Sequence, residues 1–130
     1  MTGRLFTGII VFAVVVGAAA SPLLVDEPET VVITLHAKAG ASAELEKVIA
    51  RHWDTARRLK LVQDAGHVTM RGTERDNQAF FLEVLTWRDA TIPDAAPPEI
   101  QTIWAEMNRL VEPRAGRPGL TIDQVSVVAR

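Results

Sequence analysis

The sequence predicts an α+β fold, in which two helices pack on one face of a four-stranded antiparallel sheet. The first observation is the segment 80–89, FFLEVLTWRD, which indicates a central strand because apolar residues point to both of its faces. The second is a pair of amphipathic helical stripes, one before and one after this strand. The third is the element order β-α-β-β-α-β, whose two right-handed crossovers place both helices on the same side.

Six elements are expected from the pattern of apolar residues, at 30–38, 42–59, 67–74, 80–89, 98–112 and 120–128. Ser42 is expected to cap the first helix. Pro98 suits the start of the second helix, and Pro113 ends it. The polar segment 75–78 joins two strands as a hairpin, and 89–96 is expected to be a loop.

The two faces of the central strand lead to a prediction about assembly. One face carries Phe81, Glu83, Leu85 and Trp87, and the other carries Phe80, Leu82, Val84, Thr86 and Arg88. Helices cover only one side of the sheet, so the second apolar face is left bare. A bare apolar face is an interaction surface, and a second copy of the same sheet is its simplest cover. We therefore expect a homodimer.

The first twenty residues lie outside the predicted domain. Arg4 precedes an apolar run at 5–16, and small residues follow with an A-x-A pattern at Ala18 and Ala20. This order is typical of a signal peptide cleaved after Ala20, and it predicts a periplasmic or secreted protein. The alternative is an uncleaved membrane anchor, because apolar residues continue through Val25.

The domain organisation and composition narrow the class of protein. The 130 residues divide into a signal peptide or anchor at 1–20, a linker at 21–29 and one domain at 30–128. The chain has no cysteine, which excludes disulfides, thiolate metal sites and a Cys nucleophile. The formal net charge of −2 argues against nucleic acid as a partner. The three histidines lie on three different elements without metal-ligand spacing, so no metal is expected.

Three segments carry a resemblance to a known family. They are VVITLHAKAG at 31–40, ELEKVI at 44–49 and LTWRD at 85–89. In this order they resemble the antibiotic biosynthesis monooxygenase (ABM) family over roughly 30–128. The resemblance implies a ferredoxin-like fold, a dimeric α/β barrel and a pocket between sheet and helices in each subunit. It also implies that Trp87, which matches the family's tryptophan at the end of the third strand, borders this pocket.

The family that the chain resembles includes proteins with several activities, and the residues of this chain argue against one of them. The family includes oxygenases that need no metal or flavin, haem-degrading enzymes, isomerases and proteins without known activity. Haem-degrading members use an Asn on the first strand and a His on the second helix. The segment 30–38 has no Asn and the segment 98–112 has no His, so no cofactor is expected. The loop after Trp87 also departs from the family pattern.

Two residues are candidates for acid–base catalysis. His36 lies inside a strand beside Thr34 on the same face, and its ordinary pKa is near neutrality. The alternative is a packed His at the dimer face with a satisfied hydrogen bond. Glu83 either holds a proton in an apolar pocket or pairs with Arg71 across the hairpin.

The candidate substrate contacts are Trp53, Arg71, Trp87 and Trp104. The three tryptophans can form an aromatic wall for a flat ligand. For Trp53 and Trp104 the alternative is core packing, since both fall on helical stripes. Three functions remain open: cofactor-independent oxygenation of a small aromatic or quinol-like compound, non-catalytic binding of a small hydrophobic ligand, and isomerase-like acid–base chemistry.

Overall fold

The computed structural model describes residues 27–129 and confirms the predicted order of elements. The chain runs through β1 (Glu29–His36), α1 (Ser42–Arg58), β2 (Val68–Thr73), β3 (Ala79–Trp87), the 3₁₀ helix η2 (Ile92–Ala95), α2 (Pro98–Leu110) and β4 (Leu120–Val125). The predicted signal peptide or anchor at 1–20 lies outside the described residues. Within 27–129, no helix has the length and apolar character needed to cross a membrane.

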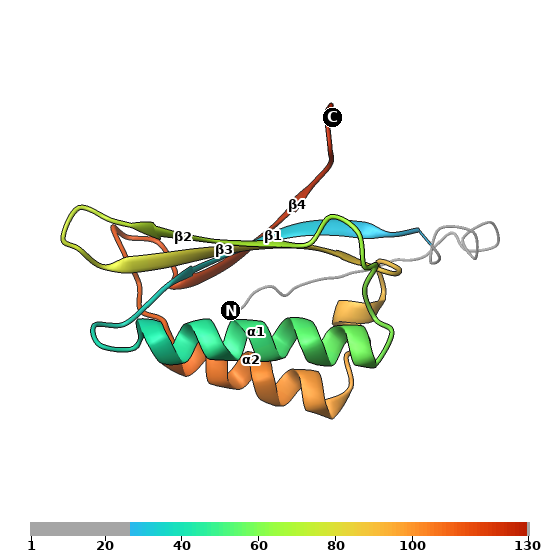
Figure 1. Ribbon diagram of the computed structural model, residues 1–130, viewed down its shortest axis with the longest axis horizontal. Coiled ribbons are helices and arrows are strands. Elements are labelled where there is room, and N and C mark those ends of the chain that lie inside the picture. The colour runs from blue at the N-terminus through green and yellow to red at the C-terminus, as the bar shows by residue number, and fades with distance from the viewer. Residues whose placement is uncertain (1–26, 130) are drawn as a thin grey trace.

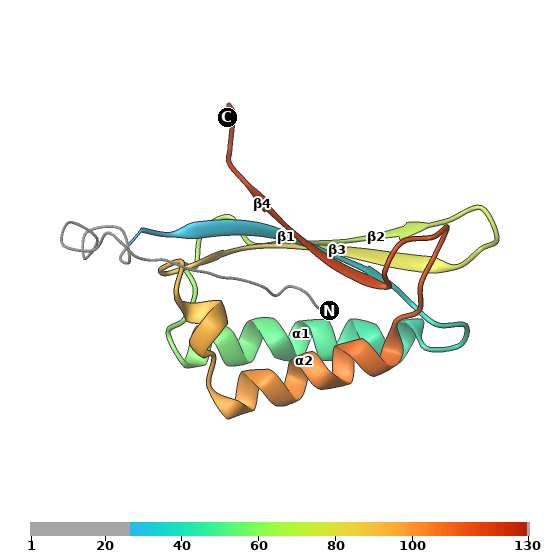
Figure 2. The same ribbon diagram turned by 180° about the vertical axis from the view of Figure 1, so that it is seen from behind.

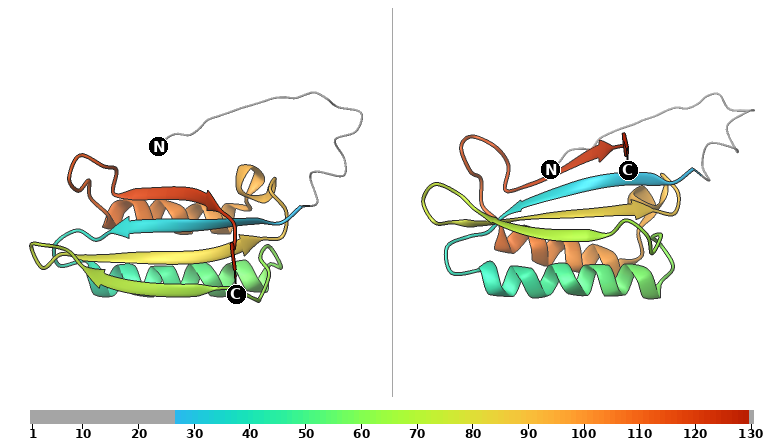
Figure 3. Two further views of the ribbon diagram at one scale, coloured as in Figure 1. Left: turned by 90° about the horizontal axis from the view of Figure 1, so that it is seen from above. Right: turned by 45° about the horizontal axis from the view of Figure 1, so that its top comes forward.

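The sheet has the strand order β2-β3-β1-β4, and every neighbouring pair is antiparallel. Each helix connects two strands that have a third strand between them, as the two predicted crossovers require. Figures 1 and 2 show α1 and α2 side by side beneath the sheet, and no helix of residues 27–129 lies on the opposite face. Seen from above, β4 and β2 form the two edges of the sheet (Figure 3). The predicted α+β fold is therefore confirmed.

The central strand β3 has the predicted alternation of faces. Phe81, Glu83, Leu85 and Trp87 are buried beneath the helices, while the residues between them are only half-buried. The half-buried set lies on the bare face. Residues of β2 extend this apolar surface, because Val68 lies opposite Val84 and Met70 opposite Leu82.

The core lies between the sheet and the two helices. It is built from the predicted helical stripes and the covered face of the sheet, with Leu35, Leu45, Ile49, Phe81, Leu85, Ile100 and Met107 among its largest fully buried side chains. Burying one such side chain stabilises the fold by about 1.5–3 kcal/mol. The helices are therefore fixed to the sheet mainly by apolar packing, which positions any polar group that lies among them.

Several predicted boundaries differ from the structure. Ser42 is the first residue of α1 rather than its cap, and the capping position, Ala41, makes no side-chain hydrogen bond. The segment predicted as a loop at 89–96 contains η2, where Pro93 fits the first turn of a 3₁₀ helix. The helix α2 ends at Leu110, before the predicted end at 112, and β4 ends at Val125, before the predicted end at 128.

Candidate functional site

A cavity of about 300 Å³ lies between the sheet and α2. It is lined by Glu29, Val31, Ile33, Trp87, Pro93, Asp94, Trp104, Met107, Asn108, Leu120 and Ile122. Strands β1, β3 and β4 form one side, α2 forms the other, and η2 closes one end. The lining is mostly apolar with a few polar groups, which is the composition of a small-molecule site, and the volume is at the lower end of the usual range.

Two tryptophans form the aromatic part of the cavity. Trp87 ends β3 and is buried, while Trp104 lies on α2 and is partly exposed. Their ring centroids are 6.2 Å apart with an interplanar angle of 87°, which is the edge-to-face arrangement that aromatic pairs prefer. Both predicted contacts, Trp87 and Trp104, therefore line the same cavity.

A buried polar chain stands behind these two rings. The indole nitrogen Nε1 of Trp104 donates a hydrogen bond to Nε2 of His52 at 3.0 Å. His52 comes from α1 and has no exposed surface. Its Nδ1 lies 3.0 Å from Oε1 of Glu83 on β3. Because Nε2 accepts the indole proton, the imidazole proton sits on Nδ1 and is donated to Glu83.

Glu83 is the centre of this chain. Its second oxygen, Oε2, accepts a hydrogen bond from Nε2 of His67 at 3.1 Å. Burial by itself raises the pKa of the Glu83 carboxyl. The hydrogen bonds from His52 and His67 to the carboxylate, together with the electrostatic attraction of the two rings for it, outweigh burial, so the pKa of Glu83 lies below its ordinary value. Glu83 is therefore a paired carboxylate that fixes His52 and, through it, Trp104.

The prediction that Glu83 pairs with Arg71 is wrong. The register places Thr69 opposite Glu83 and Phe81 opposite Arg71. Arg71 instead reaches Glu46 at 3.2 Å, and its guanidinium carbon lies 5.6 Å from the centre of the Phe81 ring. It therefore lies at the solvent-exposed edge of the sheet, on the side of α1, and does not line the cavity.

Trp53 also lies outside the cavity. Its ring stacks on His67 with the two centroids 3.7 Å apart and the planes inclined by 7°. The guanidinium of Arg57 lies 5.8 Å from the centre of the same indole. Trp53 therefore supports the outer end of the Glu83 chain, and the proposed wall of three tryptophans is reduced to two.

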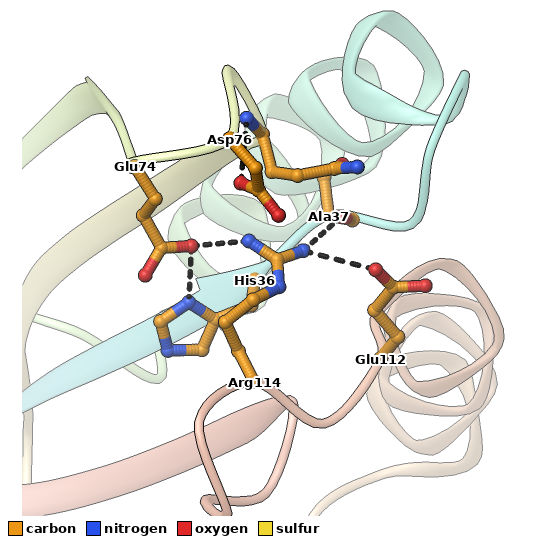
Figure 4. A network of polar contacts seen from close by, with 7 residues as sticks. His36, Ala37, Glu74, Asp76, Glu112 and Arg114 are labelled. Atoms are coloured by element: carbon orange, nitrogen blue, oxygen red, sulfur yellow. Dashed lines mark hydrogen bonds and ion pairs between the residues drawn. The ribbon is translucent and has the colours of Figure 1, made fainter.

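His36 belongs to a different network, at the far end of the sheet (Figure 4). It lies opposite Phe80, whose side chain is on the bare face, whereas Glu83 is on the covered face. Its Nδ1 is 3.0 Å from Oε1 of Glu74, and Arg114 binds the same carboxylate oxygen. The structure therefore does not bring His36 together with Glu83 or with the cavity.

Two carboxyl groups meet at the cavity, and neither was a sequence candidate. Glu29 begins β1 and is half-buried, while Asp94 lies on η2. Burial raises the pKa of Glu29, and the negative charge of Asp94 raises it further. Among residues 27–129, no group of three or more His, Cys, Asp or Glu is placed to hold a metal ion.

The sequence contained a signal for the buried chain. His52 falls on the apolar stripe of α1, and Glu83 falls on the apolar face of β3 that the helices were expected to cover. Two polar residues on facing apolar surfaces need partners, and each is the other's nearest candidate. For Glu29 and Asp94 no such signal was present, because both lie in segments that read as polar linker and loop.

Comparison with known proteins supports the fold. No sequence model of a known family matches this chain, and no curated protein matches it. Among solved structures it is similar to a mutant of SnoaB, a cofactor-independent oxygenase from Streptomyces nogalater, with 18% identity and a TM-score of 0.56 over 79% of this chain and 95% of that chain.

Two further structures have the same architecture. One is a dimeric ferredoxin-like protein of unknown function from Jannaschia sp. CCS1, with 19% identity and a TM-score of 0.53 over 78% of this chain and 100% of that chain. The other is a candidate antibiotic biosynthesis monooxygenase from Deinococcus radiodurans, with 16% identity and a TM-score of 0.51 over 78% and 94%. The chain thus has the ferredoxin-like fold of ABM-type proteins, and the resemblance predicted from the sequence is confirmed at the level of the fold.

Proposed function

We propose that this protein is an exported ABM-type oxygenase that oxidises a small aromatic or quinol-like compound without a cofactor. The observation that carries the proposal is the cavity lined by Trp87 and Trp104, with the carboxyl of Glu29 at its side. The two indoles offer flat apolar contacts to an aromatic ring. The similarity in fold to SnoaB, a cofactor-independent oxygenase, supports the same class of reaction.

The proposed reaction begins with removal of a substrate proton. Glu29 is the base in this proposal, because its half-buried carboxyl lines the cavity that would hold the substrate. The resulting carbanion transfers one electron to O₂, and the two radicals combine to a peroxide. Loss of water then leaves a new carbonyl, so one oxygen atom stays in the product and the other leaves as water.

This assignment differs from the two bases considered from the sequence. His36 lies on the other side of the sheet, and both oxygens of Glu83 are occupied by His52 and His67. In the proposal Glu83 therefore acts as a positioning residue, because it holds His52, which in turn accepts the indole proton of Trp104.

Oxygen uptake tests the proposal. We expect the purified protein, with chelator present and no flavin or haem added, to consume oxygen with anthrone- or quinol-type compounds above the uncatalysed rate. Glu29→Gln should lower this rate by about 100-fold or more, the usual contribution of a positioned base. Asp54→Asn, on the exposed side of α1, is the matched control. Uptake equal to the uncatalysed rate, or full activity in Glu29→Gln, would contradict the proposal.

A second candidate function is non-catalytic binding of a small ligand by the same cavity. One observation favours it, namely that neither His36 nor Glu83 lines the cavity. Tight ligand binding without oxygen uptake would establish it. The isomerase alternative needs an acid and a base on opposite sides of the substrate. Glu29 and Asp94 lie close enough to interact, so their arrangement does not favour it.

We also propose that the protein is a homodimer formed through the bare face of the sheet. Val68, Met70, Leu82 and Val84 supply its apolar surface, and the residues after β4 project from the same side (Figures 1 and 2). The similar Jannaschia protein is described as dimeric. Light scattering should give the mass of two chains for the wild type and of one chain for Met70→Glu. A monomeric wild type would contradict the proposal.

Export rests on residues 1–20 and is tested separately. We expect the protein recovered outside the cytoplasm to begin at Ser21. The alternative, an uncleaved anchor, predicts a membrane-bound protein that still begins at Met1. Sequencing the N-terminus of the recovered protein distinguishes the two, and recovery only from the cytoplasm would contradict export.

A further inference from the structure

The charge of the cavity gives information about its ligand. Glu29 and Asp94 are the ionisable residues in the lining, and no Lys, Arg or His is among the described residues that line it. The rest of the lining consists of apolar side chains, two indoles and Asn108. A ligand that enters this cavity therefore meets negative charge without a neutralising cation.

Carboxylates at a half-buried position gain most from a cationic partner. A carboxylate that loses water without a partner is destabilised, and the pKa of Glu29 is raised by burial and then by Asp94. An ammonium group reverses both effects, because it attracts both carboxylates and donates charge-assisted hydrogen bonds. An anionic ligand has the opposite effect, since like charges brought together at a binding site cost several kcal/mol.

The tryptophans favour the same kind of ligand. The flat indole rings pack against an aromatic ring of the ligand, while the two carboxyl groups attract its ammonium group. Trp87 and Trp104 present their rings at right angles, at a centroid distance of 6.2 Å, in the cavity that also contains the two carboxyl groups. Aromatic contact and negative charge thus coincide in a volume of about 300 Å³, which suits a small ligand.

We propose that the ligand of this cavity is a small aromatic amine, with its ammonium group beside Glu29 and Asp94 and its ring against Trp87 and Trp104. This deepens the proposed function, because it names the substrate class of the same cavity.

Three probes with the same phenylethyl group and different charge test the proposal. They are 2-phenylethylamine, 2-phenylethanol and 3-phenylpropanoate, titrated into the intact protein under nitrogen by calorimetry at neutral pH. We expect the amine to bind at least about tenfold more tightly than the alcohol, and the carboxylate to bind most weakly. In the double variant Glu29→Gln, Asp94→Asn the amine should lose this advantage, while the alcohol still binds.

Matched variants and separate readouts make the result decisive. Asp54→Asn, which removes an acidic group outside the cavity, should keep the preference for the amine. Asp94→Asn alone changes an exposed residue, and it should reduce the preference even where the double variant fails to fold. Equal binding of amine and carboxylate, an unchanged preference in Asp94→Asn, or no binding of any probe would overturn the inference. Amine-selective binding without oxygen uptake would leave the inference standing and remove the oxygenase proposal.

Discussion

The molecule contains the same pair of side chains twice, in two different surroundings. His52 and Glu83 are 3.0 Å apart, and so are His36 and Glu74. The first pair has no exposed side-chain surface, whereas in the second His36 is 14% and Glu74 26% exposed. The distances are equal, so the two pairs differ in their burial and their neighbours and not in their separation. In a buried site the loss of one partner leaves the other charged or polar and without water, whereas near the surface solvent replaces it.

The two pairs also differ in the other hydrogen-bond partners that surround them. Glu74 shares its oxygen with Arg114, whose guanidinium also contacts the carbonyl oxygen of Ala37 at 2.7 Å and Glu112 at 3.2 Å (Figure 4). The Glu83 carboxylate is bound by His52 and His67. The partly exposed network offers Arg114 other acceptors and lies near solvent, whereas the members of the buried chain have no water to replace a lost partner. We therefore expect mutations in the two networks to differ strongly in cost.

The largest effect is expected for Glu83→Ala. Removing this carboxylate leaves the fully buried His52 and the partly buried His67 without their acceptor, and breaking a buried pair in this way costs about 3–5 kcal/mol. Urea denaturation should show this loss in the free energy of unfolding. Glu83→Gln keeps an acceptor oxygen and should lose less. A cost for Glu83→Ala below that of Glu74→Ala would contradict the importance given to burial.

The second-largest effect is a dependence of the free energy of unfolding on pH, which arises from Glu83. Its folded pKa lies below the ordinary value of 4.5, so the folded state binds fewer protons than the unfolded state in that range. The stabilisation is therefore complete above pH 4.5 and is lost as the pH falls through the folded pKa. The free energy of unfolding should decrease on acidification, and less steeply in Glu83→Gln. The pKa of Asp89 is also lowered, by hydrogen bonds from Thr91, so Asp89 contributes an acid dependence of the same sign. The variant Asp89→Asn therefore measures how much of the acid dependence comes from this residue and not from Glu83.

The smallest effect is expected for Glu74→Ala. Glu74 is partly exposed, and its loss leaves Arg114 with Ala37, Glu112 and solvent. We expect a loss of about 1 kcal/mol or less in the free energy of unfolding, and a smaller loss at high salt because screening weakens such pairs. Measurements at two salt concentrations check this. A large, salt-independent loss would show that the network of Figure 4 behaves like the buried one.

The same contrast explains what could be predicted from the sequence. The faces of β3 and the apolar stripes of both helices follow from side-chain periodicity, and the structure confirms them. The pairing of Glu83 depends on the register between β2 and β3, in which Thr69 and not Arg71 lies opposite. The apolar pattern of one strand does not determine its register against the neighbouring strand. His52 falls on the apolar stripe of α1, and periodicity identifies such a position as buried without identifying its partner.

Fewer residues of the cavity than of the core could be predicted from the sequence. Trp87 and Trp104 were candidates, but Glu29 and Asp94 lie in segments that carry no periodic signal. They reach the cavity because β1 begins one residue earlier than predicted and because η2 forms within the expected loop. Both features depend on the packing of distant segments, so they appear only in the folded chain.

The three tryptophans allow the most direct test of the central claim, that the cavity between the sheet and α2 is the binding site. Trp87 and Trp104 line it, and Trp53 lies outside it on His67. Titration of the ¹⁵N-labelled protein with 2-phenylethylamine should shift the indole N–H signals of Trp87 and Trp104 and leave that of Trp53 in place. A shift of Trp53 alone, or no shift of any indole signal at saturating ligand, would contradict the claim.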